Sequence, residues 1–210
     1  MSTEGVIYQK LEAFIRKFYT NELIKGIIFF FGLGLLYFIF TLSVEFFLWL
    51  QPTGRTFLFW LFILVELFLL VRLIFFPIFK LVKLQKGIDY TQAASIIGKH
   101  FNEIEDRLTN FLQLTQNKVQ SELLLASIEQ KSIELQPIPF SNAVNFQANK
   151  KYLPWAVLPI LLILIFFTTG NGSFIFQSLN RVVHFNTAFA PPAPFQFKIL
   201  NSSLVTEQNK

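Results

Sequence analysis

Cysteine is absent from the 210-residue chain, and histidine occurs only twice. Without cysteine the protein has no disulfide framework, no thiolate zinc site and no cysteine nucleophile, and two histidines are too few for a His-rich metal site. The sequence also has no glycine-rich phosphate loop, no Gly-x-Ser-x-Gly nucleophile elbow and no zinc motif. We therefore expect a protein that is not an enzyme and that binds no cofactor, metal or nucleic acid.

Charge is also scarce, because Asp, Glu, Lys and Arg make up 15% of the chain, against about 25% in ordinary soluble domains. Hydrophobic residues make up 53%, and 28 residues are phenylalanine. This excess lies in three blocks, which are long enough to cross about 30 Å of hydrocarbon at about 1.5 Å per helical residue. The sequence therefore predicts an all-α membrane protein with transmembrane helices over 23–50, 56–79 and 152–169, the first two forming a hairpin.

Basic residues flank these blocks unevenly and predict the orientation of the spans. The hairpin link has one basic residue, Arg55, and the first one after the third span is Arg181. By the positive-inside rule the N-terminus and residues 81–151 are cytoplasmic, while the link and everything after residue 170 lie outside. This predicts a multi-pass protein of the inner membrane of a Gram-negative bacterium, with a periplasmic C-terminus. The basic residues that flank the spans on the cytoplasmic side are Lys10, Arg16, Lys17, Lys25, Lys80, Lys83, Lys86, Lys150 and Lys151.

Two cytoplasmic segments have helical patterns. Residues 1–22 are expected to form an amphipathic helix, which either lies on the anionic inner leaflet or packs on the cytoplasmic domain. Residues 80–151 are expected to form a helical insert of three helices that are too short to be stable alone. The first of these is expected over 90–98, with Thr91 as its N-cap and Gly98 as its stop.

The second helix of the insert begins near Asn102, and the third runs over 121–136, where Pro137 ends it. An apolar stripe follows the second helix at helical spacing. The insert can pack on itself, on the N-terminal helix or on a partner, and we take the stripe as a candidate partner-docking surface. The stripe consists of Ile104, Leu108, Phe111 and Leu112.

Beyond the third span the sequence predicts a helix over 173–186 that lies on the periplasmic surface of the membrane. Residues 190–210 follow, with a stiff Pro-rich linker and then strict alternation over 195–199, which is a strand pattern. One strand is not stable alone. We therefore expect a periplasmic Ig-like β region to begin here and the chain to be the N-terminal part of a longer protein.

Three ionisable residues lie within the predicted spans: Glu45, Glu66 and Arg72. Glu66 is near the middle of its span, where a bare carboxylate is costly and often marks a proton or ion path. Arg72 is six residues further along the helix and lies on a different face, so it is a poor partner for Glu66. One alternative is a conducting role for Glu66. The other is a structural role, in which Glu66 is protonated or forms bonds within an oligomer, while Glu45 and Arg72 reach the membrane interfaces.

Two segments resemble a family of large bacterial membrane proteins known as domain of unknown function 4175. One is Ile-Ile-Gly-Lys-His-Phe-Asn-Glu-Ile-Glu-Asp-Arg-Leu, from Ile96 to Leu108, and the other runs from Arg181 to Phe195. Members commonly have proline at the position of Asn102. The resemblance covers essentially the whole chain, including the two-plus-one spacing of the spans. It implies a much longer protein with periplasmic Ig-like domains, in a family without established catalytic residues.

Genes of this family often neighbour those of MoxR-type AAA+ ATPases and von Willebrand factor A membrane proteins. The leading hypothesis is therefore a non-enzymatic anchor or scaffold in an envelope-assembly or maintenance complex, with membrane lipids, such proteins or further copies of itself as partners. An alternative is a proton- or ion-conducting subunit that uses Glu66. A third hypothesis is a transmembrane sensor, although the segment around His100 lacks the phospho-acceptor pattern of sensor kinases.

Overall fold

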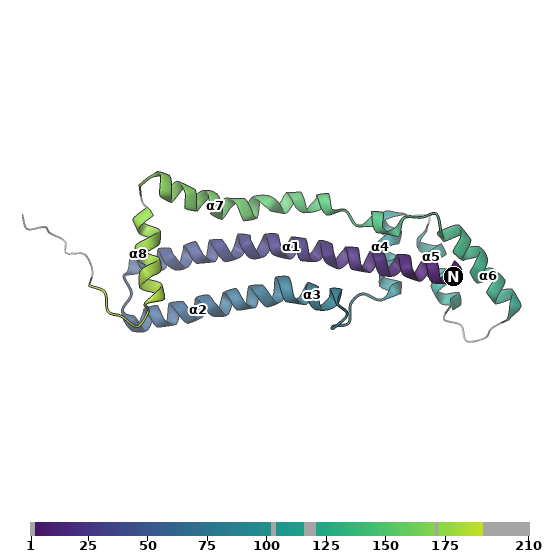
Figure 1. Cartoon of the computed structure of the whole chain (residues 1–210), viewed down its shortest axis with the longest axis horizontal. Coiled ribbons are helices and arrows are strands. Elements are labelled where there is room, and N and C mark those ends of the chain that lie inside the picture. Colours follow the sequence, from purple (N-terminus) through teal and green to yellow (C-terminus); the bar gives the residue numbers. More distant parts are fainter. Residues whose placement is uncertain (1–2, 102–103, 116–120, 171, 191–210) are drawn as a thin grey trace, which may run out of the picture.

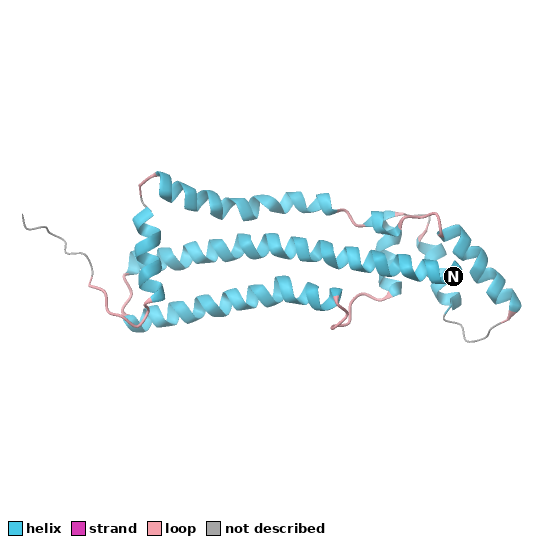
Figure 2. Ribbon diagram, viewed as in Figure 1, coloured by secondary structure: helices cyan, strands magenta, loops and turns pink. Residues whose placement is uncertain are grey.

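The computed structural model describes residues 3–101, 104–115, 121–170 and 172–190, and all regular structure within them is helical (Figures 1 and 2). Three helices are long and apolar enough to cross a membrane. The strand predicted over 195–199 and the β region around it lie outside the described residues. In chain order the elements are α1 (Thr3–Leu48), α2 (Pro52–Leu70), the π-helix η1 (Val71–Phe75), α3 (Phe76–Leu81), α4 (Tyr90–His100), α5 (Glu105–Thr115), α6 (Glu122–Leu135), η2 (Phe140–Ala143), η3 (Phe146–Tyr152), α7 (Leu153–Thr168) and α8 (Gly172–Val183).

α1 is one continuous helix of 46 residues, with no break at residue 22. The segments 1–22 and 23–50, predicted as two elements, are parts of this helix because no proline precedes Pro52 and the glycines before it are isolated. A helix of this length extends for about 69 Å, roughly twice the thickness of the hydrocarbon layer. α1 therefore runs from the bundle of long apolar helices into the insert, residues 80–151 (Figure 1).

α1 lies between the other two spans, with α2, η1 and α3 along one side and α7 along the other (Figure 1). In the described part of the chain, α2 and α7 each pack on α1 but not on each other. The second span begins at Pro52 rather than at residue 56, because proline suits the first turn of a helix. The link of the hairpin therefore shrinks to residues 49–51. This open arrangement leaves most of the surface of α2 and α7 for lipid or for other chains.

The π-helix η1 interrupts the second span next to Pro77. Since Pro77 has no N–H, the carbonyl of Leu73 loses the partner that an α-helix would give it. The Phe76 N–H bonds to the carbonyl of Val71, five residues back, which is the π-helical pattern. A Cβ on Gly26 would lie only 1.9 Å from the Leu73 carbonyl oxygen. The absence of a side chain at Gly26 therefore allows the backbone of η1 to pack directly on α1.

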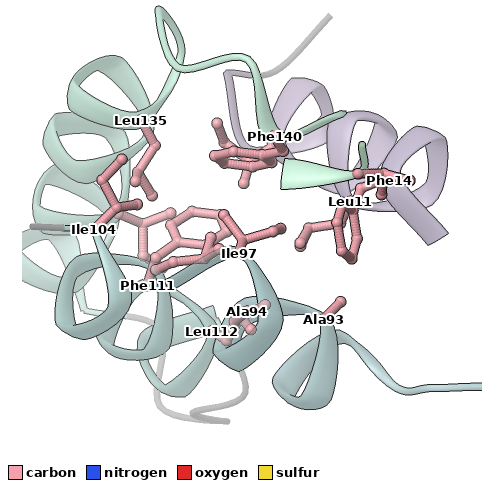
Figure 3. Close-up of a cluster of buried hydrophobic side chains, with 14 residues drawn as sticks. Leu11, Phe14, Ala93, Ala94, Ile97, Ile104, Phe111, Leu112, Leu135 and Phe140 are labelled. Carbon is pink, nitrogen blue, oxygen red and sulfur yellow. The ribbon is translucent and has the colours of Figure 1, made fainter. Parts of the chain in front are cut away.

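The insert folds around the first half of α1, which supplies one wall of its hydrophobic core (Figure 3). Lys10 of α1 donates to the backbone carbonyls of Gln136 and Ile138, and Lys17 donates to that of Ser141. Of the two interpretations of residues 1–22, packing on the insert is therefore the arrangement observed. The buried core residues are Ile7, Leu11, Phe14, Ala93, Ala94, Ile97, Ile104, Leu108, Phe111, Leu112, Ile128, Leu135, Phe140 and Val144.

The caps of the insert helices differ in part from the prediction. Asp89 rather than Thr91 caps α4, and its carboxylate accepts a hydrogen bond from the Gln92 N–H at 2.7 Å. Gly98 lies inside α4, where a Cβ would meet the Cβ of Glu105 at 2.4 Å. Its role is close packing of α4 on α5 and not helix termination. Ser121, where the sequence predicted the third helix to begin, is the N-cap of α6.

α8 crosses the end of the bundle that carries the link 49–51, here called the hairpin end; the insert lies at the opposite end, the insert end (Figure 1). α8 ends at Val183 instead of residue 186. It packs on α1, α2 and α7. Its buried face consists of Phe174, Ser178, Arg181 and Val182.

Candidate functional site

A buried carboxylate of α1 binds two arginines at the hairpin end. Glu45 lies in the last turn of α1, Arg55 in the first turn of α2 and Arg181 in α8. Glu45 Oε1 accepts hydrogen bonds from Arg55 Nε at 3.1 Å and from Arg181 Nε at 3.0 Å. All three side chains are almost completely shielded from solvent. This ion-pair cluster, Glu45–Arg55–Arg181, therefore ties three helices together.

Further contacts fix the orientation of both guanidinium groups. Arg55 donates through Nη1 to the Thr187 carbonyl and through Nη2 to the Leu50 carbonyl, each at 2.7 Å. The guanidinium of Arg181 lies over the indole of Trp49, 3.9 Å from the ring centroid. Trp49 has a φ of 44°, a left-handed conformation that is uncommon for a bulky residue. The turn that ends α1 thus holds an aromatic ring against the cluster.

The electrostatics of the cluster are unbalanced, because one carboxylate faces two guanidinium groups. Glu45 Oε2 is buried and has no hydrogen-bond partner among the described residues. Removing one partner of a buried ion pair costs about 3–5 kcal/mol, since the other charge is left unpaired. Both arginines are enclosed by protein groups on several sides. This geometry suits a clamp that fixes α8 to the hairpin rather than a catalytic centre.

Glu66 forms a second and separate site, in the last third of α2 and halfway along the second span, Pro52–Leu81. A Cβ on Gly34 of α1 would stand 2.9 Å from Glu66 Oε2, so glycine leaves room for the carboxylate. Glu66 Oε1 is buried and has no hydrogen-bond partner in the part of the chain that the structure describes. The carboxylate therefore lies in a groove of 340 Å³ between α1 and α2 that is otherwise apolar. The groove is also lined by Phe30, Phe31, Leu35, Phe38 and Phe62.

The three ionisable residues predicted within the spans do not converge. Arg72 is exposed on η1, where its guanidinium lies over the ring of Phe76. Gly34, beside Glu66, and Glu45 are eleven residues apart on α1, which separates them by roughly 16 Å along the axis. Among the described residues, no three His, Asp or Glu side chains come together in a group that could hold a metal ion.

The candidate docking stripe of the second insert helix lies within the core of the insert. Its side chains are at most 8% exposed, because α5 needs an apolar face to pack on α4, α6 and α1. They are not available to a partner in this structure. The four residues are Ile104, Leu108, Phe111 and Leu112.

Sequence reasoning missed Arg55, Arg181 and Gly34 as parts of the two carboxylate sites. The sequence does contain a signal for Arg55, which follows Glu45 by ten residues across a tight hairpin link. Such spacing brings opposite charges to the same level of antiparallel helices. Arg181 gives no comparable signal, because only the course of α8 over the hairpin end brings it to Glu45.

Comparisons with family models, curated proteins and solved structures found no match. The assignment as a membrane protein therefore rests on the helices of this chain alone. The described residues contain three helices that can span a membrane, as in a multi-pass membrane protein. Membership of the family that the sequence resembles stays a prediction.

Proposed function

We propose that the chain is a non-enzymatic scaffold of the bacterial inner membrane, which orients a periplasmic region and docks a cytoplasmic partner. The observation that supports this best is the continuity of α1. Its first half is built into the core of the insert, and its last turn carries Glu45, which holds α8. One helix thus connects the two ends of the molecule, as a scaffold requires.

The charges at the two ends support the orientation within the membrane. In the part of the chain that the structure describes, the Lys and Arg residues at the hairpin end are Arg55 and Arg181, and both are paired with Glu45 and buried. The insert end carries exposed lysines beside the spans, among them Lys83, Lys86 and Lys150. By the positive-inside rule the insert is then cytoplasmic, and α8 is periplasmic.

Among the helices of the insert, α6 carries large exposed apolar side chains, and we assign partner docking to it in place of the stripe on α5. Leu123 is 82% exposed, and Leu125 and Ile133 are more than half exposed. Large apolar side chains that stay exposed on a water-facing helix gain stability when a partner buries them. The partner proposed from the family resemblance is a MoxR-type AAA+ ATPase or a von Willebrand factor A protein.

Affinity purification of the full-length protein from detergent-solubilised membranes, followed by mass spectrometry, tests this function. We expect the ATPase to co-purify in near-equal amount with the wild type. Leu123→Asp should abolish this recovery, whereas Gln130→Asp, which places the same charge at another exposed position of α6, should preserve it. Recovery of the protein alone, as a defined homo-oligomer, would contradict the scaffold proposal.

A second candidate function is proton or ion conduction. It is favoured by the buried Glu66 Oε1, which has no hydrogen-bond partner among the described residues. Since the groove around Glu66 is otherwise apolar, a conducting path needs polar groups from a second chain. Flux through liposomes that contain the wild type or Glu66→Gln tests it. Conduction predicts flux in the wild type that the variant loses, and equal background leakage in both removes the hypothesis.

A further inference from the structure

A cavity of 350 Å³ opens at the insert end, where α1, the end of α3, the loop 82–89 and the start of α4 meet. It plays no part in the scaffold function proposed above. Its wall combines four basic side chains with two tyrosines. This basic pocket is defined by Arg16, Tyr19, Lys80, Lys83, Lys86 and Tyr90.

Two carboxylates also line the basic pocket, and each already accepts a hydrogen bond from the protein. Glu12 accepts hydrogen bonds from Lys83 Nζ at 3.0 Å and from the Tyr90 hydroxyl at 3.3 Å. The carboxylate of Asp89 caps α4 by accepting from the Gln92 N–H.

The four bases of the pocket outnumber its two carboxylates, and the charge of Arg16 acts on Glu12 without a direct ion pair. Within the described residues, Arg16, Lys80 and Lys86 form no ion pair. Positive charge that the protein does not neutralise favours an anion in the pocket.

The backbone of the loop is held in a defined conformation. The Leu84 N–H bonds to the Phe79 carbonyl at 2.8 Å and the Lys83 N–H to the Lys80 carbonyl at 3.3 Å, which is a Schellman cap on α3. Lys83 has a φ of 60° in this cap, a position where glycine is the usual residue.

Tyr19 of α1 anchors the far side of the loop. Its hydroxyl accepts a hydrogen bond from the Ile88 N–H at 2.7 Å. Gly87 lies so close that a Cβ there would stand 2.9 Å from the tyrosine ring. The basic pocket is thus preformed by the fold rather than assembled from free side chains.

The position of the pocket matches the headgroup layer of a bilayer. It begins where the second span ends, and the next residues alternate between apolar and basic or polar side chains. Val82 and Leu84 are more than half exposed, although both are apolar, and Lys83 and Lys86 lie beside them. Apolar side chains that enter the acyl layer, next to lysines at headgroup level, are typical of membrane-surface contact.

We propose that the basic pocket binds the phosphate of an anionic phospholipid headgroup, with Arg16, Lys80 and Lys86 as its ligands. The acyl chains then run along the exposed apolar surface of η1 and α3, where the rings of Phe75 and Phe79 stack. A soluble phosphate compound shares the anion chemistry but not this apolar surface. The bound molecule is therefore a lipid.

Native mass spectrometry of the full chain in neutral detergent tests the site, with added phosphatidylglycerol or phosphatidylcholine as the probe. We expect the wild type to retain phosphatidylglycerol preferentially. Each basic residue near an anionic lipid contributes about fivefold in affinity, so Lys80→Gln/Lys86→Gln should weaken binding roughly 25-fold. Lys86→Gln alone, a change on an exposed side chain that cannot disturb the fold, should weaken it about fivefold.

The matched control is Lys150→Gln/Lys151→Gln, which removes two charges from the same end of the bundle but outside the pocket. It should leave phosphatidylglycerol retention within about twofold of the wild type, since a distant surface charge is screened by salt. Equal losses in the two double variants would overturn the proposal, because binding would then depend on general surface charge. Displacement of the lipid by equimolar glycerol 3-phosphate or inorganic phosphate would also overturn it, in favour of a soluble anion.

Discussion

Glu45 and Arg181 are 136 residues apart in the chain, yet Glu45 Oε1 and Arg181 Nε lie 3.0 Å apart in a buried contact. Arg55 binds the same oxygen at 3.1 Å. α8 is therefore attached to both helices of the hairpin through a single carboxylate. Because one acid serves two bases, the residues of the cluster are not equivalent: loss of the acid leaves both arginines unpaired, whereas loss of Arg181 leaves one complete ion pair.

This inequality predicts the order of two substitutions. Glu45→Gln should lower the free energy of unfolding by about 3–5 kcal/mol, the cost of leaving a buried charge unpaired. Arg181→Gln should cost only about 1.5–3 kcal/mol, the value of a hydrogen bond to a charged group. Denaturant unfolding in detergent, followed by Trp49 fluorescence in a Trp60→Phe/Trp155→Phe background, measures both. Equal or reversed costs would show that Glu45 does not hold the cluster together.

The close approach of α1 and η1 predicts a large effect of a single methyl group. In Gly26→Ala the new Cβ meets the Leu73 carbonyl, a backbone group that cannot turn away. We expect a loss of about 1–3 kcal/mol from overpacking. Gly54→Ala is the control, because its Cβ meets only the Leu50 side chain at an ordinary 3.5 Å. Thermal unfolding should show Gly54→Ala as neutral or stabilising, since alanine favours helix; similar losses in both variants would contradict the close approach.

The contact between Gly34 and Glu66 predicts coupling between the two positions. Gly34→Ala should destabilise the protein, because its Cβ meets the Glu66 carboxylate at 2.9 Å. The cost should be smaller than for Gly26→Ala, since the end of a side chain can shift. In a Glu66→Ala background the clash is absent, so a double-mutant cycle on the free energy of unfolding should give a coupling above about 0.5 kcal/mol. Strictly additive effects would place the carboxylate away from Gly34.

The insert predicts different outcomes for two leucines. Leu108 is fully buried, so Leu108→Ala should cost about 2–5 kcal/mol and Leu108→Asp should abolish the protease resistance of the insert. Leu123→Ala should stay within about 0.5 kcal/mol, because that side chain is exposed. Limited proteolysis of the detergent-solubilised protein distinguishes the two. Equal resistance of Leu108→Asp and the wild type would contradict the core around α5.

The spans could be predicted from the sequence because each depends on a local property, the length of an apolar block. The continuity of α1 could not, because the change in composition near residue 22 reflects a change of surroundings and not a break in the backbone. Side chains of α1 before residue 22 face the insert, and those after residue 22 face lipid or the other spans. The same backbone hydrogen bonds continue through both environments.

Tertiary contacts account for the other differences. The apolar stripe that includes Leu108 is buried in the core of the insert. The spacing of apolar residues alone does not show whether the residues that pack on a stripe come from the same chain or from a partner. Glu45 and Glu66 are conspicuous in the sequence, since carboxylates are costly within spans. Their neighbours Arg181 and Gly34 become visible only once the helices are placed side by side.

The proposed scaffold function depends on α1 being one rigid helix from the insert to the hairpin end. Because the chain has no cysteine, spin labels can be attached to an otherwise unchanged protein carrying Ala13→Cys and Phe47→Cys, two exposed positions on α1. Double electron–electron resonance on the full chain in lipid nanodiscs then measures the distance between them. A continuous helix should give one narrow distribution near about 51 Å, which is 34 residues at about 1.5 Å each. A broad distribution, or one centred near roughly 40 Å as for a helix that turns onto the membrane surface at residue 22, would contradict it.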